Sequence, residues 1–118
     1  MIPLVVKSTD PLAVEKSINI LKKGGVIVYP TDTLYGFGVD ANNNYAIERI
    51  NKLKNRHSPM SVIACRFEQA MSWTNIKEKD IEHAKKILES SSTLILDAKK
   101  NIASNKILGR NNTTLGVR

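Results

Sequence analysis

The sequence contains very little cysteine and few aromatic residues. One cysteine occurs among 118 residues, and aromatic side chains make up 5% of the chain. A single cysteine excludes an internal disulfide, and this usage is typical of proteins from a reducing compartment. Cys65 ends the apolar run at 62–65. We therefore expect it to be a small buried hydrophobic residue rather than a nucleophile.

Long hydrophobic runs are absent as well. No window approaches the roughly 20 apolar residues that a membrane-spanning helix needs. The apolar run within residues 1–6 is too short for a signal peptide. We therefore expect a cytoplasmic protein with no membrane partner. A chain of 118 residues has room for one domain at most, which we place at residues 1–118.

Common metal-binding and nucleotide-binding motifs are also missing. His57 and His83 are isolated, and neither has a partner at the spacing of metal ligands. We therefore predict no metal site built by the protein. The sequence has neither a Walker A pattern nor Gly-x-Gly-x-x-Gly. Any Mg²⁺ would have to arrive with a nucleotide substrate such as ATP.

Positive charge, by contrast, is in excess. The formal net charge is +7, from 18 Lys and Arg against 11 Asp and Glu. Such a charge favours anionic partners, namely nucleotide phosphates, tRNA or double-stranded RNA. The basic residues are spread along the chain, so solvated helix faces are an alternative explanation for most of them.

Apolar spacing and turn residues predict strands that alternate with helices. We expect strands at 4–6, 26–29, 60–64, 93–96 and 115–118, helices at 10–23, 46–53, 67–73 and 78–89, and irregular structure at 97–113. Asp10 and Pro11 are typical of a helix start, Gly24-Gly25 of a helix end, and Asn42-Asn43-Asn44 of a turn with a cap. The expected apolar faces of the first two helices are Val14, Ile18 and Leu21, and Ala46, Ile50 and Leu53. This alternation indicates an α/β fold with a mixed sheet.

The most informative segment is 30–38, Pro-Thr-Asp-Thr-Leu-Tyr-Gly-Phe-Gly, which directly follows the strand predicted at 26–29. Its hydroxyls and carboxylate can hydrogen-bond a polar ligand, and Asp32 could instead cap the turn. Gly36 and Gly38 allow a close backbone approach or a positive φ. Loops at strand ends of α/β sheets are common binding sites, although a plain turn would use the same residues.

Three segments together resemble the YrdC-like family, the threonylcarbamoyl-AMP synthases. They are residues 24–38, the run 46–50 leading into Lys54-Asn55-Arg56, and 114–118, which is similar to the family's Gly-Val-Arg segment. The resemblance implies a twisted mixed sheet with flanking helices. The family domain continues past this point to a Ser-Ala-Asn-like motif, so we expect residues 1–118 to be the N-terminal part of such a domain, incomplete at the C-terminus.

The resemblance also implies an activity. Family members join L-threonine, bicarbonate and ATP into threonylcarbamoyl-AMP, a nucleotidyl transfer that releases pyrophosphate. A transferase partner then uses this product to modify an adenosine of tRNA. Two alternatives remain open: a basic module that binds tRNA or double-stranded RNA without catalysis, and a carbamoyl-handling domain of the kind found in hydrogenase-maturation proteins.

Site residues follow from the resemblance position by position. Lys54 and Arg56 match catalytic positions, and Arg56 and Thr114 match ATP contacts. Thr33 and Arg118 match contacts to L-threonine, and Thr31 and Tyr35 are expected to line the same pocket. Arg56 must leave the helix if it is to meet a ligand together with Lys54. Without the loop at 30–38, both would be read as solvated cations at a helix end. Ser58 stands where the family has a lysine for ATP.

Overall fold

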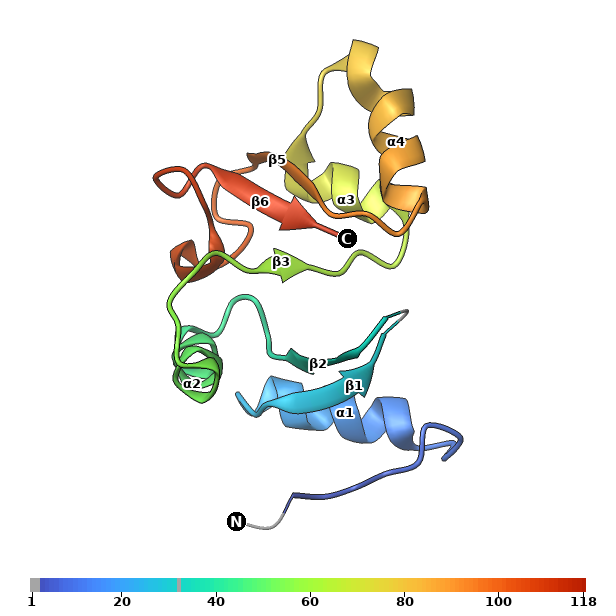
Figure 1. Ribbon diagram of the computed structural model, residues 1–118, viewed down its shortest axis with the longest axis vertical. Coiled ribbons are helices and arrows are strands. Elements are labelled where there is room, and N and C mark those ends of the chain that lie inside the picture. Colours follow the sequence, from blue (N-terminus) through green and yellow to red (C-terminus); the bar gives the residue numbers. More distant parts are fainter. Residues whose placement is uncertain (1–2, 32) are drawn as a thin grey trace.

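The computed structural model describes residues 3–31 and 33–118 and shows an α/β fold with two separate sheets (Figure 1). Strands β1 (Ile27–Pro30) and β2 (Tyr35–Gly38) form an antiparallel hairpin. A second sheet contains, in spatial order, β3 (Ser61–Val62), β6 (Thr114–Val117), β5 (Leu94–Ala98) and β4 (Thr74–Asn75). Strand β3 runs parallel to β6 and the other neighbours are antiparallel, so this sheet is mixed, as predicted.

The helices cover different parts of the two sheets. Helix α1 (Ala13–Lys22) lies against the hairpin, whereas α3 (Phe67–Trp73) and α4 (Ile81–Glu89) lie beside β4 and β5 (Figure 1). Helix α2 (Asn44–Lys54) packs next to the short 3₁₀ helix η2 (Asn105–Ile107), and η1 (Glu78–Asp80) leads into α4. The buried core therefore lies around the four-stranded sheet and contains Ile47, Ala70, Ile107, Leu115 and Val117.

Helix α1 starts later and is less buried than the sequence predicts. Its N-cap is Leu12, and Asp10 instead folds the preceding turn, because Asp10 Oδ1 accepts a hydrogen bond from the Leu12 N–H at 2.8 Å. That bond lowers the pKa of Asp10 below its usual value. Pro11 therefore precedes the helix, and the expected apolar face remains open, with Val14 72% exposed. The predicted end is confirmed, since Gly24 closes the helix with a φ of +78°.

Helix α2 begins as predicted, but its buried face is different. The Asn43 side chain accepts a hydrogen bond from the Ala46 N–H at 2.9 Å and so caps the first turn. The expectation that Leu53 is buried is wrong, because this side chain is 59% exposed. The buried stripe also includes Ile47 and Asn51. Its centre therefore lies about 90° around the helix from Leu53.

Three further expectations are wrong. Residues 4–6 form no strand. Strand β3 ends at residue 62, so the chain has already left the sheet at Cys65, which is exposed rather than buried. The stretch 97–113 is less irregular than expected, because β5 continues to Ala98 and η2 places Ile107 in the core at 3% exposure.

Candidate functional site

The turn that joins β1 to β2 is organised by one hydroxyl group. Thr31 Oγ1 accepts hydrogen bonds from the N–H groups of Thr33 at 3.2 Å and Leu34 at 3.1 Å, and it donates to the Leu34 carbonyl. The Thr31 side chain therefore serves mainly to fold the turn. The Thr33 hydroxyl lies 3.4 Å from the Thr31 hydroxyl, and the Thr33 residue is exposed. Asp32, the other candidate cap, lies outside the described residues.

The two faces of the hairpin differ in their surroundings. Tyr35 pairs with Pro30 and is 75% exposed, on the face opposite to Tyr29 because successive strand residues alternate. Neither Gly36 nor Gly38 has a positive φ, so of the two expected alternatives only a close approach remains. Gly38 is instead a place of close packing, where an added Cβ would lie 2.8 Å from the Tyr29 ring. A side chain at position 38 would therefore clash with the Tyr29 ring.

The Lys54–Arg56 segment leaves the helix as predicted. Asn55 adopts the left-handed conformation with φ of 54° and ψ of 43°. The Arg56 N–H then reaches back to the Asn51 carbonyl at 3.0 Å, and the Asn55 N–H bonds to Lys52 at 3.1 Å. This pattern is a Schellman motif, which ends a helix sharply and turns the next residue away from its axis. Lys54 and Arg56 are both exposed, so their side chains are accessible to a ligand.

The two candidate site residues near residue 118, Thr114 and Arg118, differ in their exposure to solvent. Thr114 is only 9% exposed, and it bridges to Gly109 across the turn that precedes β6. This burial does not favour direct contact with ATP, and that role stays a prediction. Arg118 is exposed. Its backbone N–H donates a hydrogen bond of 2.9 Å to the Val62 carbonyl at the end of β3, and its carbonyl accepts one of 2.9 Å from the Ala64 N–H. Those bonds fix the direction in which the Arg118 side chain leaves the sheet.

The candidate residues fall into two groups in space. Figure 1 shows the turn of the hairpin and the C-terminal end of β6 on one side of the molecule, and α2 on the other side. Thr33 belongs to that turn, and Arg118 directly follows β6. Lys54 and Arg56, at the end of α2, are apart from them. The sequence alone could not indicate this separation, and the roles of these residues stay predictions.

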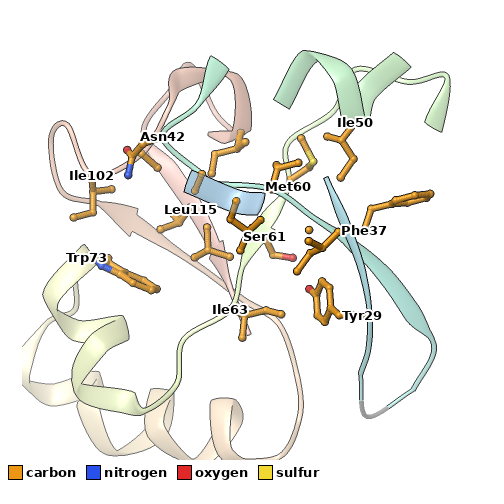
Figure 2. Close-up of a pocket in the computed structure, with 18 residues that line it drawn as sticks. Tyr29, Phe37, Asn42, Ile50, Met60, Ser61, Ile63, Trp73, Ile102 and Leu115 are labelled. Carbon is orange, nitrogen blue, oxygen red and sulfur yellow. The ribbon is translucent and has the colours of Figure 1, made fainter. Parts of the chain in front are cut away.

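A cavity of about 440 Å³ lies between the hairpin and the four-stranded sheet. It is lined mostly by apolar side chains, including Tyr29 from β1, Ser61 and Ile63 from the β3 segment, and Trp73 from α3 (Figure 2). Thr31, Thr33 and Tyr35 are not among its lining residues. Sequence reasoning missed this cavity, because only the spacing of apolar residues in β1 and β3 pointed to it, and that spacing is equally typical of a closed core.

A second, polar hollow of about 500 Å³ lies between α2 and η2. Its lining includes His57, Ser58, Lys106 and Glu48. Lys106 Nζ lies 2.6 Å from Glu48 Oε1, and this ion pair lowers the pKa of Glu48 below its usual 4.5. Ser58 therefore shares this hollow with a lysine that is already paired with a carboxylate.

Clusters of metal ligands and membrane-spanning helices are both absent from the described residues. Within 3–31 and 33–118, no three His, Cys, Asp or Glu side chains gather in a way that could hold a metal ion. The absence of a protein-built metal site stays a prediction. In the same part of the chain, none of the helices has the length and apolar character needed to cross a membrane.

Comparison with known proteins decides the family. Residues 19–118 match the Sua5/YciO/YrdC family, whose description reads "Telomere recombination". The chain belongs to this family. Threonylcarbamoyl-AMP synthase from Haemophilus ducreyi is 31% identical over 101 residues, which are 81% of this chain and 54% of that protein. The synthase from Saccharophagus degradans is 41% identical over 54 residues, or 44% of this chain and 28% of that protein.

Solved structures of the Sua5/YciO/YrdC family agree with the fold. A double variant of P. abyssi Sua5 superposes with a TM-score of 0.81 and 22% identity over 99% of this chain and 35% of its own. P. abyssi Sua5 complexed with L-threonine superposes with a TM-score of 0.76 and is 27% identical. That match covers 89% of this chain and 31% of the Sua5 chain. E. coli YciO superposes with a TM-score of 0.69 and is 25% identical over 89% of this chain and 52% of the YciO chain. The YrdC-like α/β fold expected from the sequence is thereby confirmed, and the chain spans about half or less of the length of these relatives.

Proposed function

We propose that this chain forms part of a threonylcarbamoyl-AMP synthase that acts in the cytoplasm. The match of residues 19–118 to the Sua5/YciO/YrdC family carries the proposal. Relatives that bear the name threonylcarbamoyl-AMP synthase support it. The substrates would be L-threonine, bicarbonate and ATP, and a transferase partner would pass the threonylcarbamoyl group to an adenosine of tRNA.

The proposed reaction has two steps. The threonine amine attacks the carbon of bicarbonate, and water leaves to give a carbamate. A carbamate oxygen then attacks the α-phosphorus of ATP, and the P–O bond to pyrophosphate breaks. This chemistry needs cations for the triphosphate, a small polar pocket for threonine, and protection of the labile carbamate from water.

The hairpin turn and Arg118 would form the threonine side of this site. P. abyssi Sua5, 27% identical over 89% of this chain, is described in complex with L-threonine. Thr33 offers a hydroxyl on a backbone that Thr31 holds in place. The Arg118 guanidinium can bind a carboxylate through two parallel hydrogen bonds. The hairpin turn and the C-terminal end of β6 lie on the same side of the molecule (Figure 1).

Lys54 and Arg56 would form the ATP side. The Schellman turn at Asn55 supports this role, because it aims Arg56 away from the helix while both side chains stay exposed. An arginine can bind a phosphate through a planar fork, whereas lysine acts as a point charge. Magnesium would come with the nucleotide. The chain spans about half the length of the Haemophilus ducreyi synthase, so we expect the chain alone to be a poor enzyme.

Pyrophosphate release tests the proposal. The protein to assay is a chimera in which this chain replaces the matching region of the Haemophilus ducreyi synthase. Release should require both L-threonine and bicarbonate, and omission of either should reduce it to background. Cooperative thermal unfolding would show that the chimera is folded. A folded chimera that releases no pyrophosphate in response to threonine would contradict the proposal.

Binding of structured RNA is the second candidate function. All Lys and Arg side chains except the half-buried Lys16 are exposed, and the net charge is +7. A-form RNA would be bound through its phosphates and shape. Affinity for tRNA should then fall steeply as salt rises, because bound counterions are released. An affinity that does not change with salt would exclude this candidate.

A further inference from the structure

The walls of the polar hollow between α2 and η2 are joined by contacts within the chain. We name this region the α2–η2 hollow and define it by its lining residues Glu48, Asn51, Lys52, His57, Ser58, Pro59, Lys106 and Leu108. Lys106 Nζ on η2 lies 2.6 Å from Glu48 Oε1 on α2. The Met60 N–H, in the segment that follows α2, donates a hydrogen bond of 3.1 Å to the Ile107 carbonyl on η2. The hollow is therefore formed by neighbouring segments that contact one another directly.

An amide group in the α2–η2 hollow has no partner in the protein. Asn51 lines the hollow and is only 5% exposed. Within the described residues, its side-chain amide makes no hydrogen bond, and no fully buried side-chain oxygen or nitrogen lacks a partner. The Asn51 amide must therefore be accessible to solvent, and the hollow that it lines provides this access. Buried polar groups are usually hydrogen-bonded, so this amide is suited to a bound molecule.

Positive side chains converge on the same hollow. Lys52, His57 and Lys106 line it together with one carboxylate, that of Glu48. The hydrogen bond and the charge of Lys106, followed by the charges of Lys52 and His57, lower the pKa of Glu48. All three bases therefore act at short range on the same place. Two lysines and one carboxylate give a local net charge of +1, and a protonated His57 would raise it to +2.

We propose that the α2–η2 hollow binds the phosphate group of a small molecule. A phosphate dianion would neutralise the local positive charge, and Lys52 offers an exposed ammonium group. The Lys106 ammonium has three N–H groups and uses one for Glu48, so others are available to phosphate oxygens. The Ser58 hydroxyl and the NH₂ group of Asn51 are further donors.

The remainder of the hollow favours a phosphate ester over the free ion. A volume of about 500 Å³ lies in the range of small-molecule sites, so it can hold an organic group beside the phosphate. The Glu48 carboxylate would repel phosphate oxygens, but it can accept a hydrogen bond from a hydroxyl of that organic group. A phosphorylated polyol combines both features.

This site is separate from the proposed ATP side. Neither Lys54 nor Arg56 lines the α2–η2 hollow. The inference rests on the hollow and not on the proposed reaction. Absence of phosphate binding would therefore leave the roles of Lys54 and Arg56 untouched, and loss of those roles would leave the hollow unchanged.

Nuclear magnetic resonance of the ¹⁵N-labelled 118-residue chain tests the proposal. The probes are inorganic phosphate and glycerol 3-phosphate, each added at constant pH and ionic strength. Saturable shifts should appear at the backbone amides of 51, 52, 57, 58 and 106. The amides of α4 should not shift, although Lys85 and Lys86 lie on that helix, because α4 does not line the hollow. Tighter binding of glycerol 3-phosphate identifies an ester site, and equal or weaker binding identifies a site for free phosphate.

A matched pair of variants tests the position of the phosphate. Lys52→Gln removes a cation from the hollow and should weaken binding of both probes by roughly fivefold or more. Arg49→Gln removes the same charge from the same helix, but Arg49 does not line the hollow, so its effect should stay below about twofold. Both side chains are exposed, so neither change should unfold the chain.

Two further variants test the sign of the electrostatic effect and the separation from the ATP side. Glu48→Gln removes the negative charge of the hollow and should tighten the binding of inorganic phosphate by roughly twofold or more. Arg56→Ala should leave phosphate binding unchanged. Shifts that do not saturate or that spread to α4, equal effects of Lys52→Gln and Arg49→Gln, weaker binding by Glu48→Gln, or a loss of binding in Arg56→Ala would each overturn the proposal.

Discussion

Replacement of Arg56 by alanine is the change that most directly probes the proposed ATP side. Arg56 is exposed, and its backbone N–H closes the Schellman turn through the Asn51 carbonyl. Alanine keeps that N–H, so the turn and the course of the backbone should persist. The substitution therefore removes the guanidinium and leaves the surrounding structure in place.

The expected magnitude follows from the hydrogen bonds that the guanidinium would make. A hydrogen bond to a charged group contributes about 1.5–3 kcal/mol, which corresponds to roughly a 10- to 100-fold loss of ATP affinity. Arg56→Lys should also lose affinity, because an ammonium group does not replace the planar fork. The melting temperature should hardly change, since an exposed cation contributes little to folding.

Titration calorimetry of ATP with the synthase chimera measures this effect. Arg49→Ala is the matched control, because Arg49 is also exposed but lies within α2 and outside the Lys54–Arg56 segment. It should bind ATP as the parent does. If Arg56→Ala binds ATP normally, or if both variants lose the same affinity, then Arg56 is only a solvated cation at a helix end. The assignment at residues 54–56 would then be withdrawn.

Three further outcomes are expected for the 118-residue chain. In urea titrations, Ile50→Ala should lower the free energy of unfolding by about 2–5 kcal/mol, because Ile50 is 2% exposed. The control Leu53→Ala should change the free energy of unfolding by less than about 0.5 kcal/mol, because Leu53 is largely exposed. Equal losses in the two variants would contradict the burial pattern. Asn43→Ala should lower the free energy of unfolding by about 1 kcal/mol, because it removes the cap of α2. Asn43→Ser should restore most of this stability. If Asn43→Ala is as stable as the parent, the cap does not stabilise α2. The pKa of Glu48 is lowered by Lys106, so the pair should stabilise the chain near neutral pH and lose this effect as pH falls below about 4.5. The stability difference between the parent and Glu48→Gln should therefore shrink on acidification, and a difference that grows would refute the pairing.

Local signals in the sequence predicted helix ends well. The cap at Asn43, the glycine at 24 and the helix over 67–73 all appear in the structure. These signals depend on hydrogen bonds within a few residues of one another, so they can be read from the chain alone. The break after Lys54 was expected for a different reason, namely that Arg56 must leave the helix to meet a ligand together with Lys54, and the structure shows that the left-handed Asn55 makes it.

Burial was harder to predict because it depends on distant neighbours. Leu53 lies at helical spacing from Ala46 and Ile50, and Cys65 ends an apolar run, but both side chains are exposed in the structure. Ile107 lies in a polar stretch, yet η2 carries it into the core between α2 and β6. The same limit applies to the site. The loop at 30–38 could be recognised from its residues, whereas the distance between that loop and Lys54 depends on how two sheets are arranged.

Direct detection of the product is the most decisive measurement. The synthase chimera would be incubated with L-threonine, ATP and isotope-labelled bicarbonate, and the nucleotides analysed by mass spectrometry. The proposed function predicts threonylcarbamoyl-AMP that carries one labelled carbon, forms only when threonine is present, and falls strongly in Arg56→Ala but not in Arg49→Ala. A folded chimera that binds ATP but forms no labelled adenylate would contradict the assignment of this chain to threonylcarbamoyl-AMP synthesis.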